Sequence, residues 1–138
     1  MSEADDGGFV VLGRMTGNSA NMVLYKLGKD GSIQWSRLYP FSCATTYATP
    51  LGVYSSASGY VLVYSSSSEV EFLTTDLAGV EQGRRSVSGT VSSDNGEIIR
   101  LSDGSFTFVN PNVYGRITLT KTKPDKTLDW NSILASNN

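Results

Sequence analysis

Residues 6–39, DGGFVVLGRMTGNSANMVLYKLGKDGSIQWSRLY, decide the fold of this 138-residue chain. A Gly-Gly turn signal precedes a short apolar run at 9–12, and a second run rich in strand formers spans 22–27. Glycines in the segment 28–31 can reverse the chain, and 32–38 follows as a more polar strand. The stretch therefore predicts three consecutive β-strands, of which the first two are covered on both faces and the third lies outermost.

This pattern recurs twice downstream. Residues 60–64 and 106–109 repeat the first apolar run, and each run follows a turn that contains glycine. Four positions of the first unit align without a gap with four of the third: Lys26, Asp30, Ile33 and Trp35 with Lys121, Asp125, Leu128 and Trp130. Each unit predicts antiparallel strands in about 50 residues, the length of a propeller blade. The chain is thus predicted to be a single domain with units at approximately 6–39, 51–87 and 97–134.

The units resemble bacterial β-propeller repeats with an Asp-Gly-Gly-aromatic start, a strand ending in Lys-Leu, a Gly turn and Trp-Ser. The first unit contains every part of this motif: Asp6, Gly7, Gly8, Phe9, Lys26, Leu27, Gly31, Trp35 and Ser36. The second keeps Gly59, Tyr60 and Gly79 but lacks the tryptophan, whereas the third keeps Trp130 but has Lys126 at the turn glycine. The resemblance implies an all-β fold of three consecutive four-stranded antiparallel blades, a partial propeller.

Two expectations about assembly follow from this repeat. Because only residues 1–5 precede the first unit, we expect the first blade to lack its innermost strand and to expose an apolar edge at 9–12. A propeller needs at least four blades. We therefore expect self-association, such as a homodimeric six-bladed ring, or contact with the remaining blades of a larger propeller. The resemblance also implies a secreted or cell-surface bacterial protein.

Two other families share parts of the pattern. Asn21, Val23 and Tyr25 match half of the bulb-type mannose-binding lectin motif Gln-x-Asp-x-Asn-x-Val-x-Tyr. Gly17 and Ser19 replace its Gln and Asp, so sugar hydroxyls would lose their hydrogen-bond partners. The segments 30–35 and 125–130 have the Asp-to-Trp spacing of the sialidase Asp box, a structural hairpin. In both segments we expect the aspartate to accept hydrogen bonds from turn amides and the tryptophan to pack on a neighbouring sheet.

Composition argues against several functional classes. The chain has no histidine and one cysteine, which excludes Ser-His-Asp and Cys-His catalysis and an intrachain disulfide. Its basic residues are scattered and its net charge is −2, which argues against nucleic acid. We expect the one adjacent basic pair, Arg84-Arg85, to be solvated strand surface. The chain has no apolar run long enough for membrane insertion and no cofactor motif. We expect the segment 94–97 to be a solvent-facing turn and not a cation site.

We therefore expect a non-catalytic binding or scaffold module that contacts a protein or a glycan. A glycan-active hydrolase is the alternative, because two suitably placed carboxylates suffice for that chemistry and the chain has thirteen acidic residues. In a propeller, the loops between second and third strands share one face with the connectors between blades, and binding residues concentrate in such loops. The residues predicted to bind there are Asn18, Asn21, Phe41, Tyr47, Asp94, Asn95, Asn112 and Tyr114.

Overall fold

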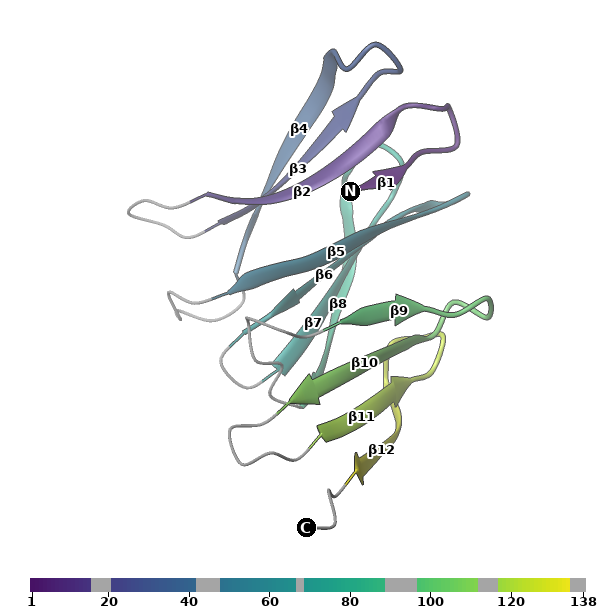
Figure 1. The fold of residues 1–138 in the computed structure, drawn as a ribbon. Coiled ribbons are helices and arrows are strands. Elements are labelled where there is room, and N and C mark those ends of the chain that lie inside the picture. Colours follow the sequence, from purple (N-terminus) through teal and green to yellow (C-terminus); the bar gives the residue numbers. More distant parts are fainter. Residues whose placement is uncertain (16–20, 42–47, 67–68, 89–96, 112–116, 135–138) are drawn as a thin grey trace.

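The structure is a computed structural model that describes residues 1–15, 21–41, 48–66, 69–88, 97–111 and 117–134 (Figure 1). The regular structure in these ranges is entirely β, with three antiparallel sheets of four strands each. The first sheet contains β1 (Ser2–Glu3), β2 (Phe9–Met15), β3 (Asn21–Leu27) and β4 (Ile33–Pro40). The second contains β5 (Thr49–Ser56), β6 (Gly59–Ser65), β7 (Glu69–Thr75) and β8 (Glu81–Ser88). The third contains β9 (Ile98–Arg100), β10 (Phe106–Pro111), β11 (Ile117–Thr122) and β12 (Leu128–Leu134).

The innermost strand of the first sheet corrects one expectation from the sequence. This strand was predicted to be missing, but Ser2 and Glu3 form β1 and pair antiparallel with β2. The turn after β1 is held by a hydrogen bond of 2.9 Å from the Ala4 N–H to the Gly8 carbonyl, and the Ala4 side chain is buried. Two residues suffice because the turn fixes their register. A segment this short has no hydrophobic period to reveal it in the sequence.

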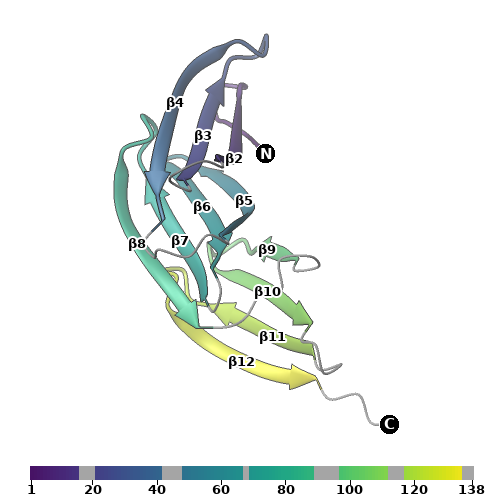
Figure 2. The same cartoon turned by 90° about the vertical axis from the view of Figure 1, so that its left-hand side faces the viewer.

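The three sheets stack face to face, with the second sheet in the middle. The core between the first and second sheets contains Val10, Met22, Leu24, Tyr39, Ala48, Val53, Tyr60, Leu62, Tyr64 and Leu73. The core between the second and third sheets contains Val61, Val63, Val70, Phe72, Val87, Phe106 and Phe108. Figure 2 shows that the stack follows an arc, with β4, β8 and β12 along its outer side. The prediction of three consecutive blades in an open, partial propeller is therefore confirmed.

The hairpin between the third and fourth strands has the same geometry in every sheet. Trp35 pairs with Lys26 and Trp130 pairs with Lys121, and each pair lies next to a β-bulge. The second sheet has a bulge at the same place, beside Gly83. The bulge repositions the side chain that follows it. The prediction that Trp35 and Trp130 occupy equivalent sites is confirmed, and Gly83 occupies the same site in the second sheet.

The aspartates of these hairpins also behave as the sequence predicted. The Ser32 N–H donates to Asp30 Oδ1 at 3.0 Å, and the Thr127 N–H donates to Asp125 Oδ1 at 3.0 Å. Trp35 packs on the second sheet, where its ring lies 6.1 Å from that of Tyr60. Trp130 is 41% exposed, because in the described part of the chain no sheet covers that face of the third sheet.

Candidate functional site

The described residues include two of the eight predicted binding residues. The other six lie outside them: Asn18, Tyr47, Asp94, Asn95, Asn112 and Tyr114. Asn21 begins β3 and is half-buried, where it pairs with Pro40. Phe41 follows β4, and its ring lies 5.6 Å from the ring of buried Tyr64. The structure therefore places Phe41 in a core contact between the first and second sheets.

A polar network lies beside this contact. The Tyr64 hydroxyl donates to a carboxylate oxygen of buried Glu71 at 2.6 Å. Arg84 donates to the Pro40 carbonyl at 2.7 Å and forms an ion pair with Glu81, which raises the pKa of Arg84 and lowers that of Glu81. The network fastens β6, β7 and β8 to the end of β4. Arg84 is thus a structural residue, contrary to the expectation that it is solvated surface.

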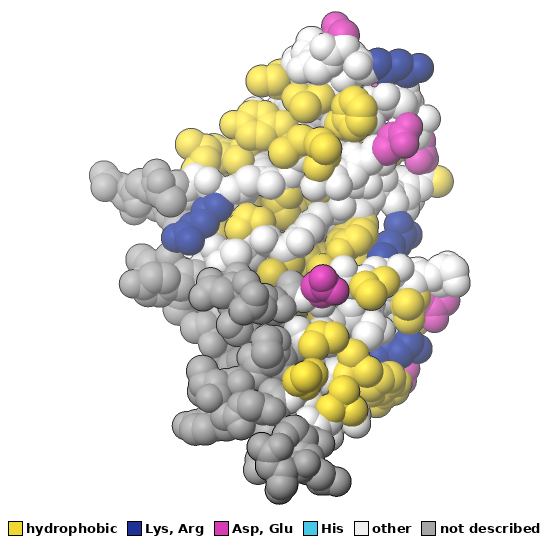
Figure 3. Space-filling view, viewed as in Figure 1, with side chains coloured by type: hydrophobic (Ala, Val, Ile, Leu, Met, Phe, Trp, Pro, Cys, Tyr) yellow, Lys and Arg dark blue, Asp and Glu magenta, His cyan; other side chains and the backbone are white. Residues whose placement is uncertain are grey.

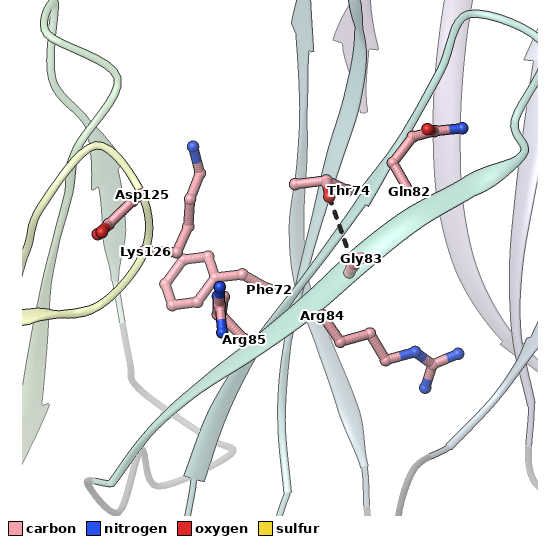
Figure 4. A pocket seen from close by; sticks show the side chains of 8 residues that line it. All are labelled: Phe72, Thr74, Gln82, Gly83, Arg84, Arg85, Asp125 and Lys126. Carbon is pink, nitrogen blue, oxygen red and sulfur yellow. Dashed lines mark hydrogen bonds between the residues drawn. The ribbon is translucent and has the colours of Figure 1, made fainter.

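An open cleft of about 430 Å³ lies between the second and third sheets (Figure 4). Its walls come from β7, from β8 and from the turn between β11 and β12. The lining residues are Phe72, Thr74, Gln82, Gly83, Arg84, Arg85, Asp125 and Lys126. A smaller cleft of about 240 Å³ lies in the first interface, where Trp35 and Gln34 line it together with Tyr60 and the turn at residues 4–6.

The missing side chain at Gly83 explains the cleft. Gly83 pairs with Thr74 beside the bulge of its hairpin, as Trp35 pairs with Lys26 beside the bulge of the first hairpin. In the first interface the indole of Trp35 spans the space to the next sheet. In the second interface glycine supplies no side chain to span that space. The cleft therefore includes the space beside Gly83 that corresponds to the space occupied by the Trp35 side chain in the first interface.

The turn residue that faces this position also differs between the two interfaces: it is Gly79 in the first and Lys126 in the second. Gly79 and Lys126 hold the same place in their turns, where their N–H groups donate to the carbonyls of Asp76 and Lys123 at 3.1 and 2.9 Å. Their φ angles are 76° and 70°, and Lys126 is the one described non-glycine residue with a positive φ. A Cβ on Gly79 would lie 2.8 Å from the Trp35 ring. A tryptophan therefore requires glycine opposite it, whereas a glycine leaves room for lysine.

The cleft carries more positive than negative charge. Figure 4 shows Lys126 and Arg85 near Phe72, whereas Arg84 points away. Burial lowers the pKa of Lys126, and repulsion from Arg100 lowers it further. The pKa of Asp125 is also lowered, mainly by its hydrogen bonds from Thr127, so this carboxylate is ionised and already engaged within its own turn.

The sequence contained the signal for this cleft, although the binding prediction was directed at the loops. The second unit lacks its tryptophan and the third unit has Lys126 at the turn glycine. These two departures from the repeat face each other across one interface. Each looks like an isolated loss until the stacking order of the sheets is known.

Comparisons with known proteins leave the family open. The chain matches no family model and no curated protein. In the part of the chain that the structure describes, no helix is long and apolar enough to cross a membrane. The same ranges hold no group of three His, Cys, Asp or Glu side chains that could bind a metal ion. The fold and the cleft therefore carry the functional argument.

Proposed function

We propose that this chain is a non-catalytic binding and scaffold module that holds an acidic group of a protein or glycan ligand. The cleft between the second and third sheets carries this proposal. It is open, it is bordered by the cations of Arg85 and Lys126, and its floor is the buried ring of Phe72. Pockets with apolar walls and a few convergent polar groups are typical ligand sites.

The chemistry of the lining suits a carboxylate or sulfate on a larger ligand. Arg85 can donate charge-assisted hydrogen bonds, which are stronger than neutral ones. Lys126 can do so as well, because its ammonium donates one hydrogen bond to the Pro124 carbonyl and has further N–H groups. Thr74 and Gln82 add neutral polar groups at the same cleft. The sheets on either side are held by apolar cores, so the cations are presented by a rigid support.

Five aspartates of the turns support a non-catalytic role. Hairpin and turn aspartates accept backbone N–H bonds: Asp6, Asp30, Asp76, Asp103 and Asp125. The pKa of Asp30 and of Asp103 is lowered, chiefly by hydrogen bonds from Ser32 and Ser105. A general acid for glycoside cleavage needs the opposite shift. These carboxylates therefore serve the turns.

Binding measurements on the intact protein test the proposal. Uronic-acid oligosaccharides and Asp/Glu-rich peptides serve as probes, by calorimetry at low and high salt. We expect Arg85→Ala and Lys126→Gly each to weaken binding about tenfold, since a charged hydrogen bond contributes about 1.5 kcal/mol. Lys126→Gly restores the glycine that the other turns carry, so it preserves the fold.

Lys123→Ala is the matched control, because Lys123 lies in the same turn but does not line the cleft. Equal losses in Lys123→Ala and Lys126→Gly would mean that general charge, and not the cleft, binds the probe. Hydrolysis of an oligosaccharide that is abolished by replacing one carboxylate would contradict the non-catalytic proposal.

A further inference from the structure

The first and third sheets each have one face that packs on the second sheet and one that does not. Val10 and Leu24 face the second sheet, so alternate residues of β2, β3 and β4 point away from it. These form the first-sheet outer face: Phe9, Val11, Val23, Tyr25, Leu27, Ile33 and Leu38. Phe106 and Phe108 likewise face the second sheet. The opposite side is the third-sheet outer face: Val109, Ile117, Leu119, Lys121, Trp130 and Leu134.

Apolar side chains make up most of both outer faces, and both faces are partly open to solvent. The polar residues on them include Asn21, Ser36, Thr107 and Ser132. Ile33 and Leu38 on the first-sheet outer face are 65% and 56% exposed. Trp130 and Leu134 on the third-sheet outer face are 41% and 52% exposed. Figure 3 shows apolar side chains over the first sheet at the top of the stack and over the third sheet at its bottom. Contiguous apolar patches of this kind usually mark interaction sites.

The third-sheet outer face copies the side of the first sheet that packs on the second. Ile117 and Leu119 pair with β12 as Met22 and Leu24 pair with β4. Trp130 stands at the place of Trp35, as described above. The third sheet therefore presents the same kind of surface as the first sheet does, but without a sheet to receive it in the described chain.

The first-sheet outer face copies the receiving side of the second sheet. Phe9 and Val11 pair with β3 as Tyr60 and Leu62 pair with β7. Tyr60 and Leu62 belong to the core that receives Trp35. Phe9 is thus the aromatic partner that a tryptophan such as Trp130 would meet.

The turn glycine completes this match. Gly31 and Gly79 occupy the same turn position, with φ of 82° and 76° and with N–H bonds to the carbonyls of Gly28 and Asp76. A Cβ on Gly79 would collide with Trp35, whereas no described atom lies within 4 Å of a Cβ on Gly31. The first sheet thus holds the glycine that a facing tryptophan requires, with nothing yet opposite it.

We propose that the third-sheet outer face binds the first-sheet outer face of a second copy of this chain, with Trp130 packed on the partner's Phe9 and the partner's Gly31. A second copy fits because this contact repeats the stacking of the sheets within the chain, with the tryptophan-glycine pairing of the first interface. The contact joins two different faces, so two copies related by a two-fold axis make it twice. The arc of the stack then continues into a closed ring of six sheets (Figure 2).

Light scattering on a sizing column tests this proposal over a range of concentrations. We expect the wild-type chain to elute at twice its own mass and Trp130→Ala to raise the dissociation constant about 30-fold, as for a central interface residue. Gly31→Lys places a side chain where Trp130 would lie, and we expect it to be monomeric. Gly104→Lys is the matched control, because Gly104 has φ of 81° and is also free of neighbours within 4 Å. It should remain dimeric.

A double variant tests whether Gly31→Lys loses the dimer through a clash at the interface or through misfolding. Trp130→Gly with Gly31→Lys reproduces the natural Gly83 and Lys126 pair at the new interface, so we expect it to recover the dimer that Gly31→Lys loses. Circular dichroism should show unchanged strand content in every variant. A wild-type chain that stays monomeric at its highest soluble concentration would overturn the proposal, and so would a Gly31→Lys variant that remains fully dimeric. Both results are independent of ligand binding in the cleft.

Discussion

The two interfaces within the chain use the same kind of hairpin but differ in the side chains that fill the gap between the sheets. Between the first and second sheets, Trp35 crosses the gap and lies against Gly79. Between the second and third sheets, Gly83 leaves the gap open, and Lys126 lines it while its ammonium donates to the Pro124 carbonyl. The strand register and the bulge are the same in both. A pair of residues that face each other across the gap therefore accounts for the difference between the closed interface and the open one.

This difference shows that two interfaces of one repeat can be packed differently while their hairpins keep the same strand register. Apolar cores hold both interfaces, so loss of one tryptophan does not separate the sheets. Once the tryptophan is absent, the facing turn no longer needs glycine and can carry a cation. The positive φ of Lys126, at 70°, shows that this turn has the glycine-type conformation although its residue is lysine.

The largest expected effect comes from placing a lysine in the closed interface. In Gly79→Lys, the new side chain meets Trp35 at 2.8 Å and Arg37 at 2.9 Å, in a backbone conformation with φ of 76°. Left-handed backbone and overpacking together predict a loss of about 3 kcal/mol in the free energy of unfolding. Urea denaturation measures this loss. Gly104→Lys has the same strain but open space, so it should lose about 1 kcal/mol; equal losses would show that Trp35 does not constrain the turn.

A smaller effect is expected from closing the open interface. Gly83→Trp combined with Lys126→Gly converts the second interface to the form of the first, and filling the cleft should stabilise the protein by about 1.5 kcal/mol. Gly83→Trp alone should gain less, because Lys126 occupies the space. A double-mutant cycle in urea measures the coupling between the two positions. Additive effects would mean that the two residues do not share one space.

Removing a tyrosine hydroxyl should cost more stability in the first interface than in the second. The Tyr39 hydroxyl donates to the Gly79 carbonyl at 2.6 Å and is buried, which raises the pKa of Tyr39 to about 12. The Tyr54 hydroxyl reaches the Ile98 carbonyl at 3.2 Å from a less buried position. We expect Tyr39→Phe to cost about 1 kcal/mol in thermal or urea unfolding, and Tyr54→Phe to cost less. The reverse order would contradict the view that the first interface is the tighter one.

The smallest expected effect is the loss of folding stability at acidic pH. The pKa of Asp30 and of Asp125 lies below the usual 3.8, mainly through hydrogen bonds from the residue two places on. A lowered folded pKa contributes stability that is full above pH 3.8 and is lost as the pH falls through the folded pKa. The urea midpoint should therefore be flat near neutral pH and fall below about pH 4. Asp125→Asn should show a smaller acid decline; an unchanged decline would mean that other groups cause it.

Much of the fold could be predicted from the sequence because its elements repeat. The apolar runs, glycine turns and aligned tryptophans gave the strands, their order and the equivalence of Trp35 and Trp130. The strand Ser2–Glu3 could not be predicted, since it depends on a turn hydrogen bond and not on a hydrophobic pattern. The cleft was missed for another reason. Gly83 and Lys126 are 43 residues apart and become neighbours only through the stacking of two sheets.

The fluorescence of Trp130 tests the central claim most directly, because the chain has two tryptophans and Trp35→Phe leaves one. The claim is that the tryptophan-glycine pairing of the first interface is repeated between copies. We predict that Trp130 emits at shorter wavelength and is protected from acrylamide at high protein concentration, and that dilution or Gly31→Lys removes both effects. Trp130→Phe, which reports Trp35, should show a protected emission at every concentration. An exposed, concentration-independent emission from Trp130 would contradict the account.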